Sequence, residues 1–258
     1  MKLGGFGRIA DYDHIKNSGF DYAELDIPEI VNLSETDFQA FCKKIKSENF
    51  PVLIGSRALP LAAPWFFTDQ FSIQEYQNYM SVACSRAKKL GIRKIILGNG
   101  KARWLLNDSS IKLEENFIML LRIYAENANA QGIEFILEPL GPEYSNYINT
   151  LPEAVHIVRR AKAPNLFIMA DLRHMYRGGE SYEDIVHCAE YVHHIHVDYP
   201  NIYPARPFPN INDGFDYSGF LSAVKRSGYN DTLTIEADIP DNWTAAYREA
   251  IKILKDVL

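Results

Sequence analysis

Short apolar runs alternate with longer amphipathic stretches along the whole chain. Short runs of this kind, set between turn signals, are typical of buried parallel strands, and apolar residues at helical spacing predict helices. We expect eight strands, near residues 2–8, 21–27, 51–55, 93–98, 134–139, 166–171, 192–198 and 233–237. We expect helices near residues 11–18, 35–48, 73–90, 112–130, 151–162, 181–190, 216–227 and 243–256.

Boundary signals support these elements. Ser34 and Ser72 each stand before a helical stretch with an acidic residue three positions on, as in a capping box, and Pro152 falls in the first turn after Thr150. Glycines stand between a helical stretch and the next strand at positions 19, 91, 132 and 228, where helix-ending glycines occur. The repeated order of helix, glycine and strand predicts a regular α/β fold.

The length of 258 residues is typical of one closed (β/α)8 barrel, and 47% hydrophobic residues can fill its core. We therefore expect residues 1–258 to form a single TIM-barrel domain. An open doubly wound sheet fits less well, because its functional residues gather at one switch point. Here the candidate residues follow several consecutive strands.

Four of the predicted strands end in a side chain that can bind a metal. These residues are Glu138, Asp171, His196 and Glu236. Successive ones are separated by about one strand–helix unit, so they should meet at the carboxyl ends of four neighbouring parallel strands. Three carboxylates and one imidazole suit a divalent ion, Mn²⁺ foremost, with Mg²⁺ or Co²⁺ as alternatives.

Each of these residues also has an ordinary structural interpretation. Glu138 or Glu236 could form a buried ion pair, and Asp171 could cap the next helix. His196 follows two other histidines, and strand alternation places it on the same face as His194. Their succession at four strand ends nevertheless favours a metal site.

Three long connections should lie over the carboxyl-terminal mouth of the barrel, at residues 56–72, 139–150 and 199–215. Long loops in this position usually shape a substrate pocket, although their prolines could merely stiffen a surface loop. They supply the candidate contacts Trp65, Tyr144 and Arg206. The aromatic run that begins at Trp65 could cover a bound substrate or form a homo-oligomer contact.

Composition excludes several classes of protein. The net charge is −6 and no run of Lys or Arg exceeds two residues, which disfavours a nucleic-acid partner. Cys42, Cys84 and Cys188 form no CxxC pair, so neither a disulfide framework nor a thiolate zinc site is indicated. The N-terminus has no apolar leader and no stretch approaches 18 apolar residues. We expect a soluble cytoplasmic protein without a membrane partner.

The segment Gly98–Arg103 has two interpretations. Its glycines and its two cations, Lys101 and Arg103, could hold an anion. A plain turn between a strand and a helix is the simpler explanation, and we favour it at this stage.

Taken in order, several segments resemble the sugar phosphate isomerase/epimerase superfamily of xylose isomerase-like TIM barrels, which includes the D-tagatose 3-epimerases. These segments are 19–25, 97–103, 137–140, 148–150, 171–175, 194–197, 213–217 and 235–236. The resemblance implies that Glu138, Asp171, His196 and Glu236 bind one divalent ion and that the two glutamates also move protons. It further implies that His174 and an arginine after His196 hold the substrate.

The chain departs from the family pattern around the substrate. Position 202, where the family's arginine is expected, is Ile, and the nearest arginine is Arg206. Tyr144 stands where the family carries a substrate-contacting glutamate. These changes leave the metal site intact but are compatible with an acidic or otherwise modified sugar.

The expected activity is isomerisation or epimerisation of a ketose or related sugar. A metal on the carbonyl and hydroxyl oxygens would stabilise an enediolate, with Glu138 and Glu236 as the proton-transfer pair. A lyase or dehydratase acting on a keto-sugar or keto-cyclitol is the alternative, because elimination shares the first step. An abasic-site endonuclease fits poorly, since the ends of the third and fourth strands carry no histidine. A catalytically silent barrel is disfavoured by the complete ligand set.

Overall fold

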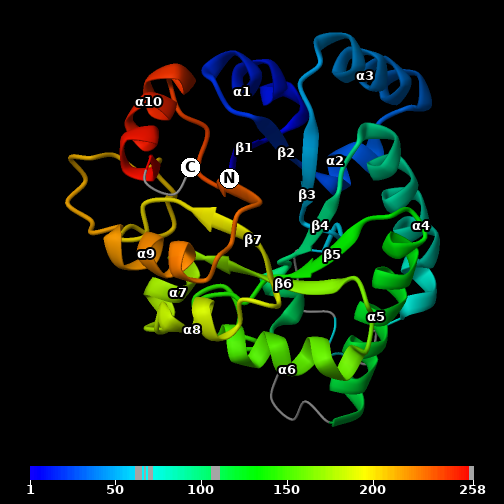
Figure 1. Cartoon of the computed structure of the whole chain (residues 1–258). Coiled ribbons are helices and arrows are strands. Elements are labelled where there is room, and N and C mark those ends of the chain that lie inside the picture. The colour runs from blue at the N-terminus through cyan, green and yellow to red at the C-terminus, as the bar shows by residue number, and fades with distance from the viewer. Residues whose placement is uncertain (62–65, 67, 69–71, 106–110, 256–258) are drawn as a thin grey trace.

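Eight parallel strands close into a barrel in chain order (Figure 1). The computed structural model describes residues 1–61, 66, 68, 72–105 and 111–255. The strands are β1 (Lys2–Gly7), β2 (Tyr22–Asp26), β3 (Val52–Ser56), β4 (Lys94–Leu97), β5 (Glu134–Leu137), β6 (Leu166–Asp171), β7 (Val192–Val197) and β8 (Thr232–Ile235). Because β1 also pairs with β8, the sheet has no free edge, and the predicted TIM barrel is confirmed.

Helices surround the barrel (Figure 1). They are α1 (Tyr12–Ser18), α2 (Ile27–Asn32), α3 (Glu35–Glu48), α4 (Ile73–Leu90), α5 (Ile111–Asn129), α6 (Leu151–Ala161), α7 (Leu172–Gly178), α8 (Glu183–His187), α9 (Ser218–Arg226) and α10 (Trp243–Leu254). Two short 3₁₀ helices, η1 (Ile9–Asp11) and η2 (Gly100–Arg103), follow β1 and β4. Among the described helices, none combines the length and the apolar character needed to cross a bilayer.

The long helices match their predicted bounds closely, whereas two short helices were not predicted. Helices α3 and α4 begin and end at the predicted residues. The sequence pattern did not reveal α2 or α7, and the second strand ends at residue 26 and not at the predicted residue 27. Both helices begin at the residue after a strand, where Asp26 and Asp171 accept a hydrogen bond from the backbone three residues on.

Most of the boundary signals act as expected. Ser34 accepts a hydrogen bond from the backbone N–H of Asp37, whereas Ser72 makes no such side-chain cap. Gly19 and Gly91 end α1 and α4 with φ of 112° and 90°, a region that costs other residues strain. These glycines let the chain turn sharply back into the next strand.

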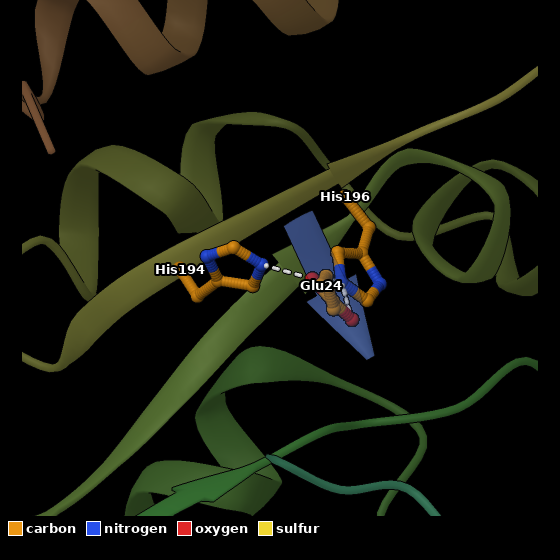
Figure 2. A group of neighbouring side chains, drawn as sticks. All are labelled: Glu24, His194 and His196. Atoms are coloured by element: carbon orange, nitrogen blue, oxygen red, sulfur yellow. Dashed lines mark hydrogen bonds and ion pairs between the residues drawn. The ribbon is translucent and has the colours of Figure 1, made fainter. Parts of the chain in front are cut away.

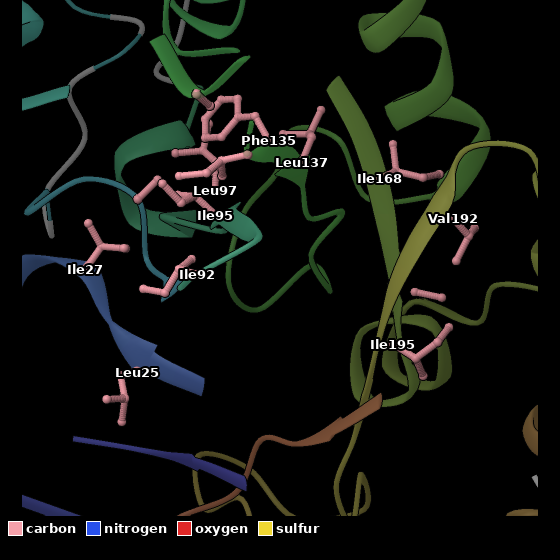
Figure 3. Close-up of a cluster of buried hydrophobic side chains, with 14 of the residues drawn as sticks. Leu25, Ile27, Ile92, Ile95, Leu97, Phe135, Leu137, Ile168, Val192 and Ile195 are labelled. Atoms are coloured by element: carbon pink, nitrogen blue, oxygen red, sulfur yellow. The ribbon is translucent and has the colours of Figure 1, made fainter. Parts of the chain in front are cut away.

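The barrel wall separates two apolar layers. The outer layer lies between strands and helices and includes strand residues such as Leu25, Ile95, Leu137 and Ile195 (Figure 3). The inner layer consists of strand residues: Tyr22, Leu53, Ile54, Ile96, Ile136 and Met169. Because side chains alternate along a strand, the residue two positions after most of these also faces inward, at the carboxyl end of the barrel.

A small residue and a large one share the barrel interior. A Cβ atom on Gly4 would lie 2.3 Å from the ring of Tyr22, so only glycine leaves room for that ring. The Tyr22 hydroxyl forms a 2.8 Å hydrogen bond with Thr234 Oγ1 on β8. This contact closes the interior beneath the carboxyl-terminal mouth, where the candidate site lies.

Candidate metal centre

The four predicted ligands converge. Glu138, Asp171, His196 and Glu236 each place one ligand atom within 4.8 Å of the ligand atoms of the others. They stand at or next to the carboxyl ends of β5, β6, β7 and β8. All but Glu236 are buried, and the Glu236 side chain is 17% exposed. The structure thus brings together the residues for which the sequence predicts metal binding.

The end of β4 leaves room for Glu138. The Glu138 backbone N–H donates to Leu97 O, which extends the strand ladder by one residue. A Cβ atom on Gly98 would lie only 2.3 Å from Glu138 Oε2. Glycine is therefore the one residue type at position 98 that leaves room for this carboxylate, and any side chain there would displace it.

Asp171 caps a helix, as one interpretation of the sequence suggested, and also faces the cluster. Its Oδ1 accepts a 3.2 Å hydrogen bond from the backbone N–H of His174 and so caps α7. Its Oδ2 faces the cluster, 3.6 Å from His196 Nδ1. The helix cap therefore fixes the orientation of the carboxylate that faces the other ligands.

His196 is held from behind by Glu24, a residue that the predicted ligand set did not include. Glu24 extends from β2 between His194 and His196 of β7 (Figure 2). Its carboxylate lies 3.1 and 3.2 Å from His196 Nε2, and a carboxylate can only accept, so Nε2 donates. The opposite nitrogen, Nδ1, faces Glu236 at 3.1 Å. Glu24 thereby selects the ring orientation and the tautomer that direct Nδ1 toward the cluster.

His194 belongs to the support beneath the site. Its Nε2 donates to Glu24 at 3.2 Å, and its Nδ1 accepts from the Thr232 hydroxyl at 2.9 Å. Burial, partly offset by Glu24, lowers the pKa of His194 to about 4 and keeps the ring neutral. His193 points the other way, as alternation predicts, and stacks on Phe167 with ring centroids 3.5 Å apart.

Arg206 reaches into the cluster. Its guanidinium lies 2.7 Å from Glu236 Oε2, 2.8 Å from Asp198 Oδ2 and 3.2 Å from Asp171 Oδ2. The Arg206 backbone also donates to the Asp238 side chain at 2.7 Å. The shifted arginine thus occupies the site from its own loop, as expected. Its contact with a substrate stays a prediction.

Arg173 has a structural role. Its side chain is fully buried and pairs with Asp198 at 2.6 Å. It donates in addition to the backbone oxygens of Tyr199, Ile202 and Ala205. The carbonyl of Ile202 is therefore hydrogen-bonded to Arg173. The same set of contacts fixes the conformation of the loop that places Arg206 in the cluster.

The other candidate contacts lie beside the cluster. His174 Nε2 is 3.4 Å from Glu138 Oε1, and its ring meets the Tyr144 ring edge-on, with centroids 4.8 Å apart. His174 lies on α7, one of the two helices that the sequence pattern did not reveal. The hydroxyl of Tyr144 is buried and has no hydrogen-bond partner among the described residues. Trp65 falls outside the described residues.

The buried carboxylates of the cluster are stabilised by positive charge. Burial alone would raise the pKa of Asp171 and of Glu236. At Asp171 the positive neighbours His174, His196 and Arg206 outweigh the effect of burial. At Glu236 the neighbours Arg206 and His196 do the same, so both pKa values lie below the ordinary range. Burial would lower the pKa of His196, but Glu24 and Glu236 raise it instead. Deprotonated carboxylates around one imidazole form a donor set that fits a divalent ion.

Comparison with known proteins identifies the family. A family model described as a xylose isomerase-like TIM barrel matches residues 12–257, so the chain belongs to that family. The resemblance predicted from the sequence is confirmed.

Individual relatives are distant in sequence. The inosose isomerase of Halalkalibacterium halodurans is 22% identical over 96% of this chain and 89% of its own length. The D-allulose 3-epimerase of Methylomonas sp. in complex with D-allulose has a TM-score of 0.83 at 16% identity, covering 100% of this chain and 97% of that one. The IOLI protein with a bound zinc atom has a TM-score of 0.77 at 19% identity, covering 100% and 98%.

We predict that the protein binds about one Mn²⁺ per chain and that Asp171→Asn or His196→Ala reduces this stoichiometry, because each removes one ligand. Elemental analysis of metal-loaded, desalted protein measures it. His193→Ala is the matched control, since His193 lies on the same strand but faces outward and pairs with Glu134. One equivalent retained in both ligand variants would contradict the assignment.

We also predict that Glu24→Gln weakens Mn²⁺ binding by about 10- to 100-fold, the usual effect of losing an outer carboxylate partner of a metal-bound histidine. Titration calorimetry gives the affinity. Glu134→Gln serves as control, because Glu134 pairs with a histidine outside the barrel. An affinity equal to that of the wild type would show that Glu24 does not position His196.

Proposed function

We propose that the protein is a divalent-metal-dependent isomerase or epimerase of a polyhydroxy ketone. One observation carries this proposal. Two glutamates from strands that are not adjacent, Glu138 after β5 and Glu236 after β8, converge on the same buried cluster as Asp171 and His196. Membership of the xylose isomerase-like family supports the same class of reaction.

The ion would be held by Glu138, Asp171, His196 and Glu236. Carboxylates with one imidazole suit Mn²⁺, which we favour over Mg²⁺ and Co²⁺. When bound, the ion supplies the positive charge that stabilises an enediolate formed from the ketone and its neighbouring hydroxyl.

The two glutamates are suited to moving the proton. The carbon next to a ketone loses a proton to a nearby carboxylate, and inversion requires that a second group return it from the other side. Arg206 keeps the pKa of Glu236 low, against the effect of burial, so Glu236 is deprotonated and can act as a base. Glu138 Oε1 lies near His174 Nε2, which can donate to an adjacent oxygen of the substrate.

Arg206, His174 and Tyr144 would orient the substrate. The guanidinium of Arg206 already lies among the ligands, and its planar set of donors matches two neighbouring oxygens. The Tyr144 hydroxyl is buried without a partner among the described residues, so a substrate oxygen could accept its hydrogen bond. For Trp65 a substrate contact is proposed from its place in the 56–72 connection alone.

The names of relatives narrow the class of substrate. One solved relative is a D-allulose 3-epimerase and one curated relative is an inosose isomerase. Allulose is a ketose and an inosose is a keto-cyclitol, so both are polyhydroxy ketones. We infer that this chain acts on a member of that class, at a carbon next to the ketone.

We predict that Glu138→Gln and Glu236→Gln each lower turnover by at least about 100-fold, because the amide keeps an oxygen but cannot accept the proton. The assay is solvent-deuterium incorporation on a panel of ketoses and inososes with Mn²⁺, with product analysis to separate epimerisation from elimination. Glu134→Gln, on the same strand as Glu138 but at its other end, is the control. Deuterium incorporation at the wild-type rate in both site variants would refute the assigned roles.

For Arg206 we predict that Arg206→Lys raises KM and that Arg206→Ala raises it by more than about tenfold, the scale of one charge-assisted hydrogen bond. Steady-state kinetics on the best substrate of the panel measures this, with metal content checked in parallel. Arg159→Ala is the control, since Arg159 contacts Tyr191 on the outer surface. Wild-type kinetics in Arg206→Ala would leave the loop with a structural role only.

A further inference from the structure

Arg103 is a fully buried arginine whose guanidinium makes no hydrogen bond within the part of the chain that the structure describes. Its side chain has 0% exposure, and none of its three guanidinium nitrogens has a hydrogen-bond partner among the described residues. Burial lowers the pKa of Arg103 to about 10, which still leaves it charged at neutral pH. A buried charge without a partner is costly, so a fold that keeps one normally uses it to bind something.

The backbone around Arg103 is fixed. The backbone N–H groups of Ala102 and Arg103 both donate to Asn99 O, and Asn99 Nδ2 donates to Leu59 O at 2.7 Å. A Cβ atom on Gly100 would lie 2.6 Å from Tyr144 O, so the turn packs directly on the β5–α6 loop. The backbone of Arg103 is therefore anchored just after the carboxyl end of β4, so the base of its side chain is fixed before a ligand arrives.

Arg103 lies at the same end of the barrel as the proposed active site. Its turn, η2, follows β4 and Gly98, and Gly98 packs directly against Glu138 Oε2 of the four-ligand cluster. Glu138 also opposes the effect of burial on the pKa of Arg103. No ion pair joins the two among the described residues, because Glu138 Oε1 lies beside His174 and its Oε2 lies against Gly98. The second neighbour, Tyr147, already donates its hydroxyl to Glu114. Neither neighbour satisfies the guanidinium.

We propose that Arg103 binds a carboxylate of the substrate, so that the natural substrate is a keto-sugar acid. This inference rests on the proposed function and specifies its substrate. A guanidinium donates two parallel hydrogen bonds to a carboxylate. The only other cation in residues 98–105 and 139–150 is Lys101, which is exposed. One buried cation matches one negative charge, which favours a carboxylate over a phosphate dianion.

The structure confirms that Gly98–Arg103 forms a turn, and our proposal adds an anion contact to it. The segment does form a turn, the 3₁₀ helix η2, and Lys101 takes no part in it as an anion ligand. The anion site consists of Arg103 alone. An acidic substrate also agrees with the departures from the family pattern at positions 144 and 202.

Matched sugars test this proposal. D-Fructose and D-fructuronate differ only at C6, which is a hydroxymethyl group in one and a carboxylate in the other. Calorimetric titration of the Mn²⁺-loaded protein should show at least about tenfold tighter binding of the acid. D-Tagatose and D-tagaturonate repeat the comparison at another configuration. D-Fructose 6-phosphate tests whether the site prefers a phosphate on the sugar to a carboxylate. Acetate tests whether a carboxylate binds as well without the sugar.

Two arginine variants assign the effect. Arg103→Met should abolish the preference for the acid, and Arg103→Lys, which keeps the charge but loses the planar donors, should reduce it. Arg93→Met, at the exposed opposite end of β4, should retain the full preference. Arg103→Met should also raise the melting temperature of the free protein, because it removes a buried charge without a partner.

The outcomes separate this inference from the proposed function. Four results would each overturn the inference. The acid and the ketose could bind equally well in both sugar pairs, or the phosphate could bind more tightly than the acid. Acetate could bind as tightly as the sugar acid, or the preference for the acid could survive in Arg103→Met. Deuterium incorporation into the neutral ketose, together with no preference for the acid, would overturn the inference and leave the proposed function standing. Acid binding through Arg103 without any exchange at carbon would support the inference and count against the proposed chemistry.

Discussion

The structure depends on how negative charge is balanced inside the mouth of the barrel. Three carboxylates face a single imidazole, His196, and a fourth, Glu24, holds that imidazole from behind. Such a group is stable only if positive charge enters it. His196 and Arg206 supply that charge to the carboxylates in the free protein. A divalent ion would supply it more completely, and this demand explains why these side chains are held so firmly.

The barrel provides the means of holding them. Inward positions of successive strands carry an apolar or neutral polar layer below and the charged layer above, and the cross-strand register places Asp171 beside His196. Supporting contacts then fix these side chains: Gly98 makes room for Glu138, and Asp171 is held by the hydrogen bond with which it caps α7. Arg173 shapes the loop from which Arg206 enters. Loss of a support should therefore affect the site almost as much as loss of a ligand.

Periodicity was enough to predict the barrel, the long helices and the convergence of the four candidate ligands, since each of them stands at the end of a strongly apolar strand. It could not reveal α2 or α7, because six or seven residues that directly follow a strand are too short to show a helical period. Glu24 lies in the middle of β2 and does not end an apolar run, so the argument that found Glu138 did not reach it. The burial of Arg103 and the fastening of Ile202 by Arg173 depend on contacts between distant loops, which no local pattern records.

Anomalous diffraction from crystals of the Mn²⁺-loaded protein tests the central claim most directly. Among the residues that the structure describes, two groups could hold an ion, one formed by Glu138, Asp171, His196 and Glu236 and one formed by Glu24, His194 and His196. Our account predicts a single anomalous peak within bonding distance of the first group, with His196 Nδ1 as ligand and Glu24 still hydrogen-bonded to Nε2. A peak between Glu24 and His194, or no peak at saturating Mn²⁺, would contradict it.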